Sequence, residues 1–138
     1  MRIMAIDYGD AHTGIAISDP TGFLTGFTTV ITAYRPEAVA EQVAALAKEH
    51  GAEELVLGHP INMDGTRGPR SEKAQAMKAL LEETTSLPVV LWDERRTTID
   101  AHQILFNSGK NAKKRKKVVD AVAASLVLEG YLTYKKNH

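Results

Sequence analysis

The order of short apolar segments and longer amphipathic segments is the feature that most constrains the fold. Residues 2–8 and 14–18 are short apolar runs rich in β-branched side chains, and the sequence Gly-Asp-Ala-His-Thr at 9–13 separates them. Such runs predict two strands joined by a tight connection, as in a hairpin. A turn signal over residues 19–22 precedes a third predicted strand over 24–32.

Helical and strand patterns then alternate. A helix is predicted from Pro36 to about residue 50, where Gly51 ends it. Its apolar side chains fall on one face: Val39, Val43, Leu46 and Ala47. The continuous apolar run at 55–58 predicts a buried parallel strand.

A second helix is expected from the Gly-Pro pair at 68–69, and a fifth strand is expected over 89–92. The inward face of this helix is predicted from four residues: Ala74, Met77, Leu81 and Thr84. Trp92, at the end of the fifth strand, is expected to pack in the core.

Two helices are predicted to close the chain, over 97–107 with Ile99 and Phe106 inward, and over 118–134. Between them a basic loop is expected. An antiparallel meander followed by βαβ units predicts an α/β fold with a mixed five-stranded sheet and helices on both faces. With 138 residues, we expect one domain over 1–138.

Composition narrows the class of protein. An apolar share of 43% and a charged share of 25% are ordinary for a globular chain. No cysteine is present, which excludes disulfides and thiolate metal sites. No apolar run approaches the roughly 20 residues of a spanning helix. A soluble cytoplasmic protein that does not bind a membrane is therefore expected.

The formal net charge of zero hides an uneven distribution. Six of the 17 basic residues lie within the eight positions 110–117, which leaves 11 basic against 17 acidic residues elsewhere. A basic segment on an acidic body suggests a polyanionic partner. A solvated charged loop is the alternative explanation.

Three carboxylates interrupt apolar elements. Asp7 ends the first predicted strand, Glu94 follows the fifth strand with Asp93 beside it, and Asp120 lies near the start of the last helix. Ligands of open α/β sheets gather at the carboxyl ends of parallel strands. An aspartate in the first turn of a helix can also simply complement the helix dipole, so Asp120 alone would not indicate a site.

If these carboxylates converge, their mutual repulsion requires cations. Mg²⁺ or Mn²⁺, as a pair of ions, fits such a site and allows hydrolysis of a phosphodiester by in-line displacement. The hypothesis is a metal-dependent nuclease that needs no catalytic histidine or cysteine.

Four blocks of sequence resemble the YqgF family, also called RuvX. They occur in the family's order and cover almost the whole chain: 7–9 with 14–19, 58–66 with 68–70, 88–98, and 113–117 with Asp120, Ala123, Ala124, Tyr131 and Leu132. The chain departs from the family pattern at His12, His59 and Arg96.

The resemblance implies a ribonuclease H-like fold with Asp7, Glu94 and Asp120 as acidic metal ligands, and it selects Glu94 over Asp93. The family is provisionally described both as a Holliday junction resolvase and as a nuclease that matures the 5′ end of precursor 16S rRNA. Precursor rRNA is the favoured partner, followed by branched DNA. A monomer and a homodimer both remain open.

Basic residues near the acidic ones are candidates for phosphate contacts. The candidate set is Arg67, Arg70, Arg95, Arg96, Lys113, Lys114, Arg115, Lys116 and Lys117. Solvation, or charge complementarity to nearby acids, is the alternative for the arginines.

Two other functions compete with a nuclease. An Asp-Gly hairpin also opens sugar kinases and actin-like ATPases, although those enzymes close two such domains over ATP. A non-catalytic RNA-binding module would keep the basic segment without turnover.

Overall fold

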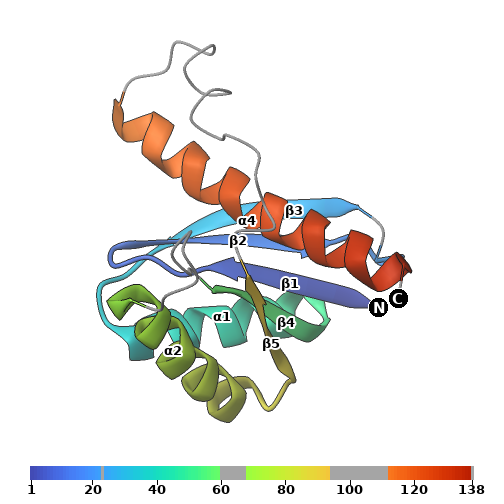
Figure 1. The fold of residues 1–138 in the computed structure, drawn as a ribbon, viewed down its shortest axis with the longest axis horizontal. Coiled ribbons are helices and arrows are strands. Elements are labelled where there is room, and N and C mark those ends of the chain that lie inside the picture. Colours follow the sequence, from blue (N-terminus) through green and yellow to red (C-terminus); the bar gives the residue numbers. More distant parts are fainter. Residues whose placement is uncertain (23, 60–67, 94–111, 138) are drawn as a thin grey trace.

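A computed structural model describes residues 1–22, 24–59, 68–93 and 112–137, with the side chains of 69, 70, 112–120 and 137 excepted. The described elements form one five-stranded sheet in the order β3-β2-β1-β4-β5, with helices on both faces (Figure 1). The strands are β1 (Arg2–Asp7), β2 (His12–Ser18), β3 (Thr25–Thr32), β4 (Ala52–His59) and β5 (Val89–Asp93). The helices are α1 (Pro36–His50), α2 (Pro69–Thr85) and α4 (Ala112–Asn137).

Strand β1 lies at the centre of the sheet. It pairs antiparallel with β2 and parallel with β4, and β4 pairs parallel with β5. Ile6 is aligned with Ile15 on one side and with Leu57 on the other. The carboxyl ends of β1, β4 and β5 therefore lie along the same edge, which we call the carboxyl edge. The predicted hairpin and mixed sheet are confirmed.

Side chains of successive strand residues point to opposite faces of the sheet. Met4 and Ile6 belong to the core that includes Val43 of α1 and Met77 of α2. Ile3, Ala5 and Val56 belong to a second core with Ala124, Val127 and Leu128 of α4. Helices α1 and α2 thus cover one face, and α4 covers the other (Figure 1).

Helices α1 and α2 agree closely with their patterns. Helix α1 has the predicted bounds, and Gly51 ends it with φ of 71° and an N–H bond to the carbonyl of Ala47. In α2, the prediction that Thr84 faces inward is wrong. Thr84 is exposed, and its hydroxyl donates to the Leu80 carbonyl oxygen at 2.7 Å. A hydroxyl near a helix end can satisfy a backbone acceptor locally, so Thr84 does not need to pack inward.

The last helix is longer than predicted. It begins at Ala112 rather than near residue 118, so Lys113–Lys117 belong to α4 and the predicted basic loop is wrong there. Alanine, lysine and arginine favour helix, and no glycine or proline occurs from 112 to 129. The helix predicted over 97–107, with Ile99 and Phe106, lies outside the described residues.

Within residues 121–136, helix α4 is buried along one face only. One stripe, which includes Leu128 and Tyr131, is buried, whereas Val122 and Leu126 are only partly buried. Trp92 is 6% exposed, as expected for a core residue. A Cβ atom on Gly130 would lie 3.3 Å from the Trp92 ring, so glycine allows the helix backbone to approach this strand closely. In the described ranges, no helix combines the length and the apolar character required to cross a membrane.

Candidate active site at the carboxyl edge

Asp7 is the last residue of β1 and is half-buried. Its backbone is aligned with Gly14 of β2. Ile3 and Ala5 contribute to the core under α4, so alternation along the strand places Asp7 on the same face as these residues. The first predicted carboxylate therefore lies at the carboxyl edge, on the face that α4 covers.

Helix α4 crosses the face of the sheet on which Asp7 lies. Its last turns lie beside the amino end of β1, where Leu132 and Ile3 line one pocket. Figure 1 shows the helix extending from there over the sheet to the side on which β1 ends, with its first turns rising away from the strands. Position 120 precedes Ala124 by one turn and Leu128 by two, so it shares a helix face with these two core residues.

The observed start of α4 changes the interpretation of Asp120. Because the helix begins at Ala112, Asp120 falls in the third turn and not in the first. Helix-dipole stabilisation of a carboxylate is confined to the first turn. The dipole explanation for this aspartate therefore does not apply.

The remaining predicted site residues are only partly covered by the structure. Glu94, Arg67, Arg95 and Arg96 lie outside the described residues, and the side chains of Asp120, Arg70 and Lys113–Lys117 are not described. Among the side chains that the structure does describe, no three acidic or histidine groups form a metal-binding cluster. The convergence of Asp7, Glu94 and Asp120 stays a prediction.

Asp93, the alternative acid on β5, lies on the other face of the sheet. Its backbone is aligned with His59 of β4. Asp93 follows Val89 by four residues on the same strand, so both side chains point to the same face, and Val89 packs in the core with α1 and α2. Asp7 and Asp93 therefore project to opposite faces. This placement argues against Asp93 as a ligand that shares an ion with Asp7.

A buried histidine lies at the carboxyl edge, at a position that the sequence marks only as a departure from the family pattern. His59 ends β4 and is 6% exposed, and its Nε2 atom lies 2.6 Å from Oγ of Ser71 in the first turn of α2. Gln75 donates a further hydrogen bond to the same Oγ atom at 3.3 Å. This contact ties the strand between Asp7 and Asp93 to the start of α2. A polar ring directly after the buried run 55–58 was the signal available in the sequence.

The hairpin after Asp7 is held in a tight conformation. A Cβ atom on Gly9 would clash with the carbonyl oxygen of His12, so only glycine fits there without a shift of the backbone. The hydroxyl of the buried Thr13 accepts a hydrogen bond from the Gly9 N–H at 3.5 Å. Nδ1 of His12 lies 3.3 Å from the Thr32 hydroxyl, which places this ring against β3.

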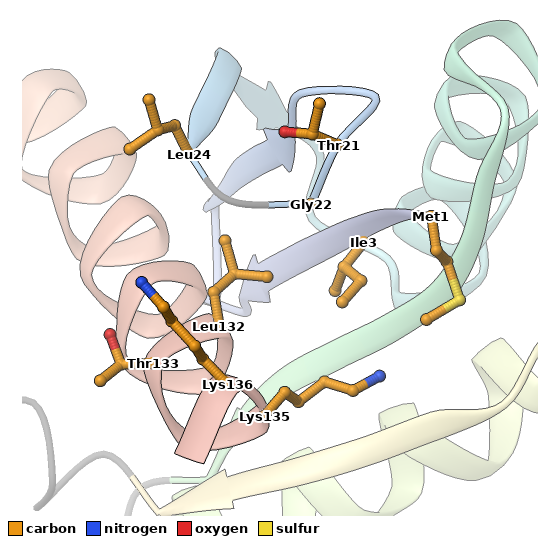
Figure 2. A pocket seen from close by; sticks show the side chains of 9 residues that line it. All are labelled: Met1, Ile3, Thr21, Gly22, Leu24, Leu132, Thr133, Lys135 and Lys136. Atoms are coloured by element: carbon orange, nitrogen blue, oxygen red, sulfur yellow. The ribbon is translucent and has the colours of Figure 1, made fainter. Parts of the chain in front are cut away.

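A pocket of about 410 Å³ lies at the opposite end of β1 (Figure 2). Ile3 of β1 and Leu132 of α4 line it, together with Met1, Leu24 and the lysines at 135 and 136. Because Asp7 ends β1 at the other edge of the sheet, this pocket is separate from the candidate active site.

The RuvX family profile, which is described as a Holliday junction resolvase, matches residues 1–134. The chain belongs to the RuvX family. A relative from Halothermothrix orenii is 43% identical over 135 residues, which cover 98% of this chain and 96% of that protein. A relative from Carboxydothermus hydrogenoformans is 37% identical over 138 residues, 100% of both chains. Both are provisionally named as pre-16S rRNA nucleases. The family expected from the sequence is confirmed.

Solved structures show the fold of this RuvX protein. RuvC of Thermus thermophilus, in complex with a Holliday junction substrate, superposes with a TM-score of 0.63 at 14% identity and covers 97% of this chain and 96% of its own. The Fowlpox virus resolvase, in complex with Holliday junction DNA, has a TM-score of 0.60 at 12% identity, with 98% and 99% covered. The ribonuclease H-like fold is confirmed.

The contact between His59 and Ser71 yields a stability prediction. We expect Ser71→Ala to lower the free energy of unfolding by about 1–3 kcal/mol, because a buried hydrogen-bond partner of the histidine is removed. Urea denaturation measures this change. Thr84→Ala, which removes an exposed hydroxyl from the same helix, is the control and should change stability by less. An equal effect of both substitutions would contradict a specific role of the buried pair.

Proposed function

We propose that this RuvX protein is a divalent-metal-dependent endonuclease that hydrolyses phosphodiester bonds in structured nucleic acid. The observation that carries the proposal is the place of Asp7 at the carboxyl edge, on the sheet face that α4 covers. A carboxylate at the rim of a core is costly unless it is paired, hydrogen-bonded or bound to a cation.

The proposed ligands are the carboxylates of Asp7, Glu94 and Asp120. The side chain of Asp93 lies on the sheet face that α1 and α2 cover. Continued alternation along the chain would direct the next residue, Glu94, to the opposite face, on which Asp7 lies. Carboxylate oxygens are the donors that Mg²⁺ and Mn²⁺ prefer. The donor set therefore fits a pair of hard divalent cations, and these are the proposed cofactors.

The three acids would hold and orient the cations against the scissile phosphate. When bound, a pair of such ions supplies an activated water and compensates the charge of the leaving oxygen. Arg95 and Arg96, which follow Glu94 in the chain, are proposed to hold the neighbouring phosphate through bidentate hydrogen bonds. Arg67, Arg70 and the basic turns of α4 would bind phosphates farther along the strand.

Processing of the 5′ end of precursor 16S rRNA, in the cytoplasm, is the proposed role. It is supported by the names of relatives that match almost the full chain at about 40% identity. The second candidate is resolution of Holliday junctions, which the description of the family profile favours. Symmetric cleavage of a four-way junction would require a homodimer, whereas processing of one rRNA end would not.

Substitution of Asp7 tests the metal site. We expect Asp7→Asn to lower the rate of cleavage of precursor 16S rRNA in Mg²⁺ by more than about 100-fold. Even the loss of a residue that only hydrogen-bonds to a metal ligand lowers metal affinity or activity roughly 10–100-fold. Binding of the RNA, measured by filter retention, should change little. A synthetic four-way junction assayed in parallel distinguishes the two candidate substrates.

Asp93→Asn is the matched control, because Asp93 ends β5, a strand parallel to β1, but projects to the opposite face. It should retain most of the cleavage activity. Equal cleavage by Asp7→Asn and the parent protein would remove Asp7 from the mechanism.

The basic turns of α4 should govern the salt dependence of binding. Replacement of Lys113–Lys117 by glutamine is expected to weaken RNA affinity and to flatten the plot of log affinity against log salt, by roughly 0.7–0.9 for each phosphate that is no longer neutralised. Glutamine preserves helix propensity. The control neutralises Lys135 and Lys136 at the other end of the same helix and should leave the slope unchanged. An identical slope for both variants would count against phosphate binding by the first turns.

A further inference from the structure

A second pocket, of about 640 Å³, lies beside the carboxyl edge on the face opposite to Asp7. Met77 and Leu80 of α2 form apolar walls, and Met77 is only 1% exposed. Tyr8 and Tyr34 also line it. Tyr8 directly follows Asp7 in the chain, so alternation along β1 directs it to the face of α1 and α2. We call this cavity the tyrosine pocket.

The aromatic lining of the tyrosine pocket is open to solvent. Tyr34 is 76% exposed although it is a large aromatic side chain. Aromatic rings with a free face are the platforms on which unpaired bases stack in proteins that bind single strands. A flat heteroaromatic ring fits a pocket that combines such a platform with an apolar wall.

The charges around the tyrosine pocket disfavour a phosphate. Among the described residues, two carboxylates, Asp10 and Glu37, and one cation, Lys73, line it. The lysine lies 3.1 Å from the Asp10 carboxylate, and Arg35 lies 3.9 Å from that of Glu37. A carboxylate offers about four acceptor positions, so paired acids can still accept further hydrogen bonds. The pocket therefore suits a ligand edge that donates hydrogen bonds.

We propose that the tyrosine pocket binds an unpaired nucleobase of the nucleic-acid strand, with its ring stacked on Tyr34 and an exocyclic amino group donating to Asp10 or Glu37. Adenine, cytosine and guanine carry this group and uracil does not. Carboxylates accept from such amino groups in base recognition.

This inference rests on the proposed function and specifies how the strand is held. Tyr8 and Asp7 are consecutive residues whose side chains project to opposite faces of one strand end. A nucleic-acid strand that wraps around the carboxyl edge of the sheet would place its scissile phosphate on one face of the sheet and a nearby base in the tyrosine pocket on the other face.

Binding of short single-stranded homopolymers tests the proposal without cleavage. Fluorescence anisotropy is measured in EDTA with labelled oligonucleotides of adenine, cytosine or uracil and the full chain. Tyr34→Ala should weaken adenine and cytosine binding roughly 5–140-fold, the range expected for loss of one stacked base. Tyr34→Phe should preserve the affinity, because the ring remains.

The matched control is Tyr134→Ala, which removes another exposed tyrosine, on α4 against Trp92. It should leave binding unchanged, and melting temperatures confirm that each variant is folded. Glu37→Gln should reduce the preference for cytosine over uracil. Equal affinity of Tyr34→Ala and the parent protein, or equal parent affinity for uracil and cytosine, would overturn the proposal. Binding of free AMP as tight as that of the adenine oligonucleotide would also overturn it, since the ligand would then be a free nucleotide.

These results separate the two proposals. If the parent protein binds bases through Tyr34 but does not cleave nucleic acid in Mg²⁺, only the nuclease proposal fails. If it cleaves nucleic acid and Tyr34→Ala leaves binding unchanged, only the base pocket fails.

Discussion

The pairing of β1 on both of its edges determines where Asp7 and Tyr8 lie. Antiparallel bonding to β2 fixes the hairpin after Asp7, and parallel bonding to β4 brings the ends of β1, β4 and β5 to one edge. Met4 and Ile6 pack under α1 and α2, whereas Ile3 and Ala5 pack under α4. A slip of one residue would exchange these faces, so burial of two cores strongly disfavours it.

Because of this pairing, the two faces of the sheet differ chemically at the carboxyl edge. Asp7 lies on the sheet face that α4 covers, and the third turn of this helix carries Asp120, where an acid gains nothing from the helix dipole. On the other side, Tyr8 lines a pocket with aromatic and acidic walls. The first face suits cations and a phosphate, and the second suits an uncharged aromatic ring with donor groups. A strand crossing the edge could use both.

Local patterns predict most of the fold, because the spacing of apolar residues and the length of each helix or strand are visible in short segments of the sequence. The hairpin, α1 and β5 follow from alternation, a 3.6-residue period and clear Pro and Gly signals. The basic segment is predicted as a loop because its charge density suggests solvation, yet lysine and arginine also favour helix and no breaker intervenes. Partners distant in the chain are not predictable, as with His59 and Ser71, or Tyr8 and Tyr34, because only strand order brings them together. The positions of Asp7, Glu94 and Asp120 at the ends of apolar elements are visible in the sequence, whereas only the family resemblance selects Glu94 over Asp93.

The central claim is that Asp7, Glu94 and Asp120 share divalent cations at the carboxyl edge. Anomalous diffraction from a crystal of this protein grown with Mn²⁺ tests it most directly. The account predicts an anomalous peak about 2 Å from an Asp7 carboxylate oxygen, with the carboxylates of Glu94 and Asp120 in the same coordination sphere or in that of an adjacent ion. A crystal in which Mn²⁺ is bound elsewhere and the Asp120 carboxylate points away from Asp7 would contradict it.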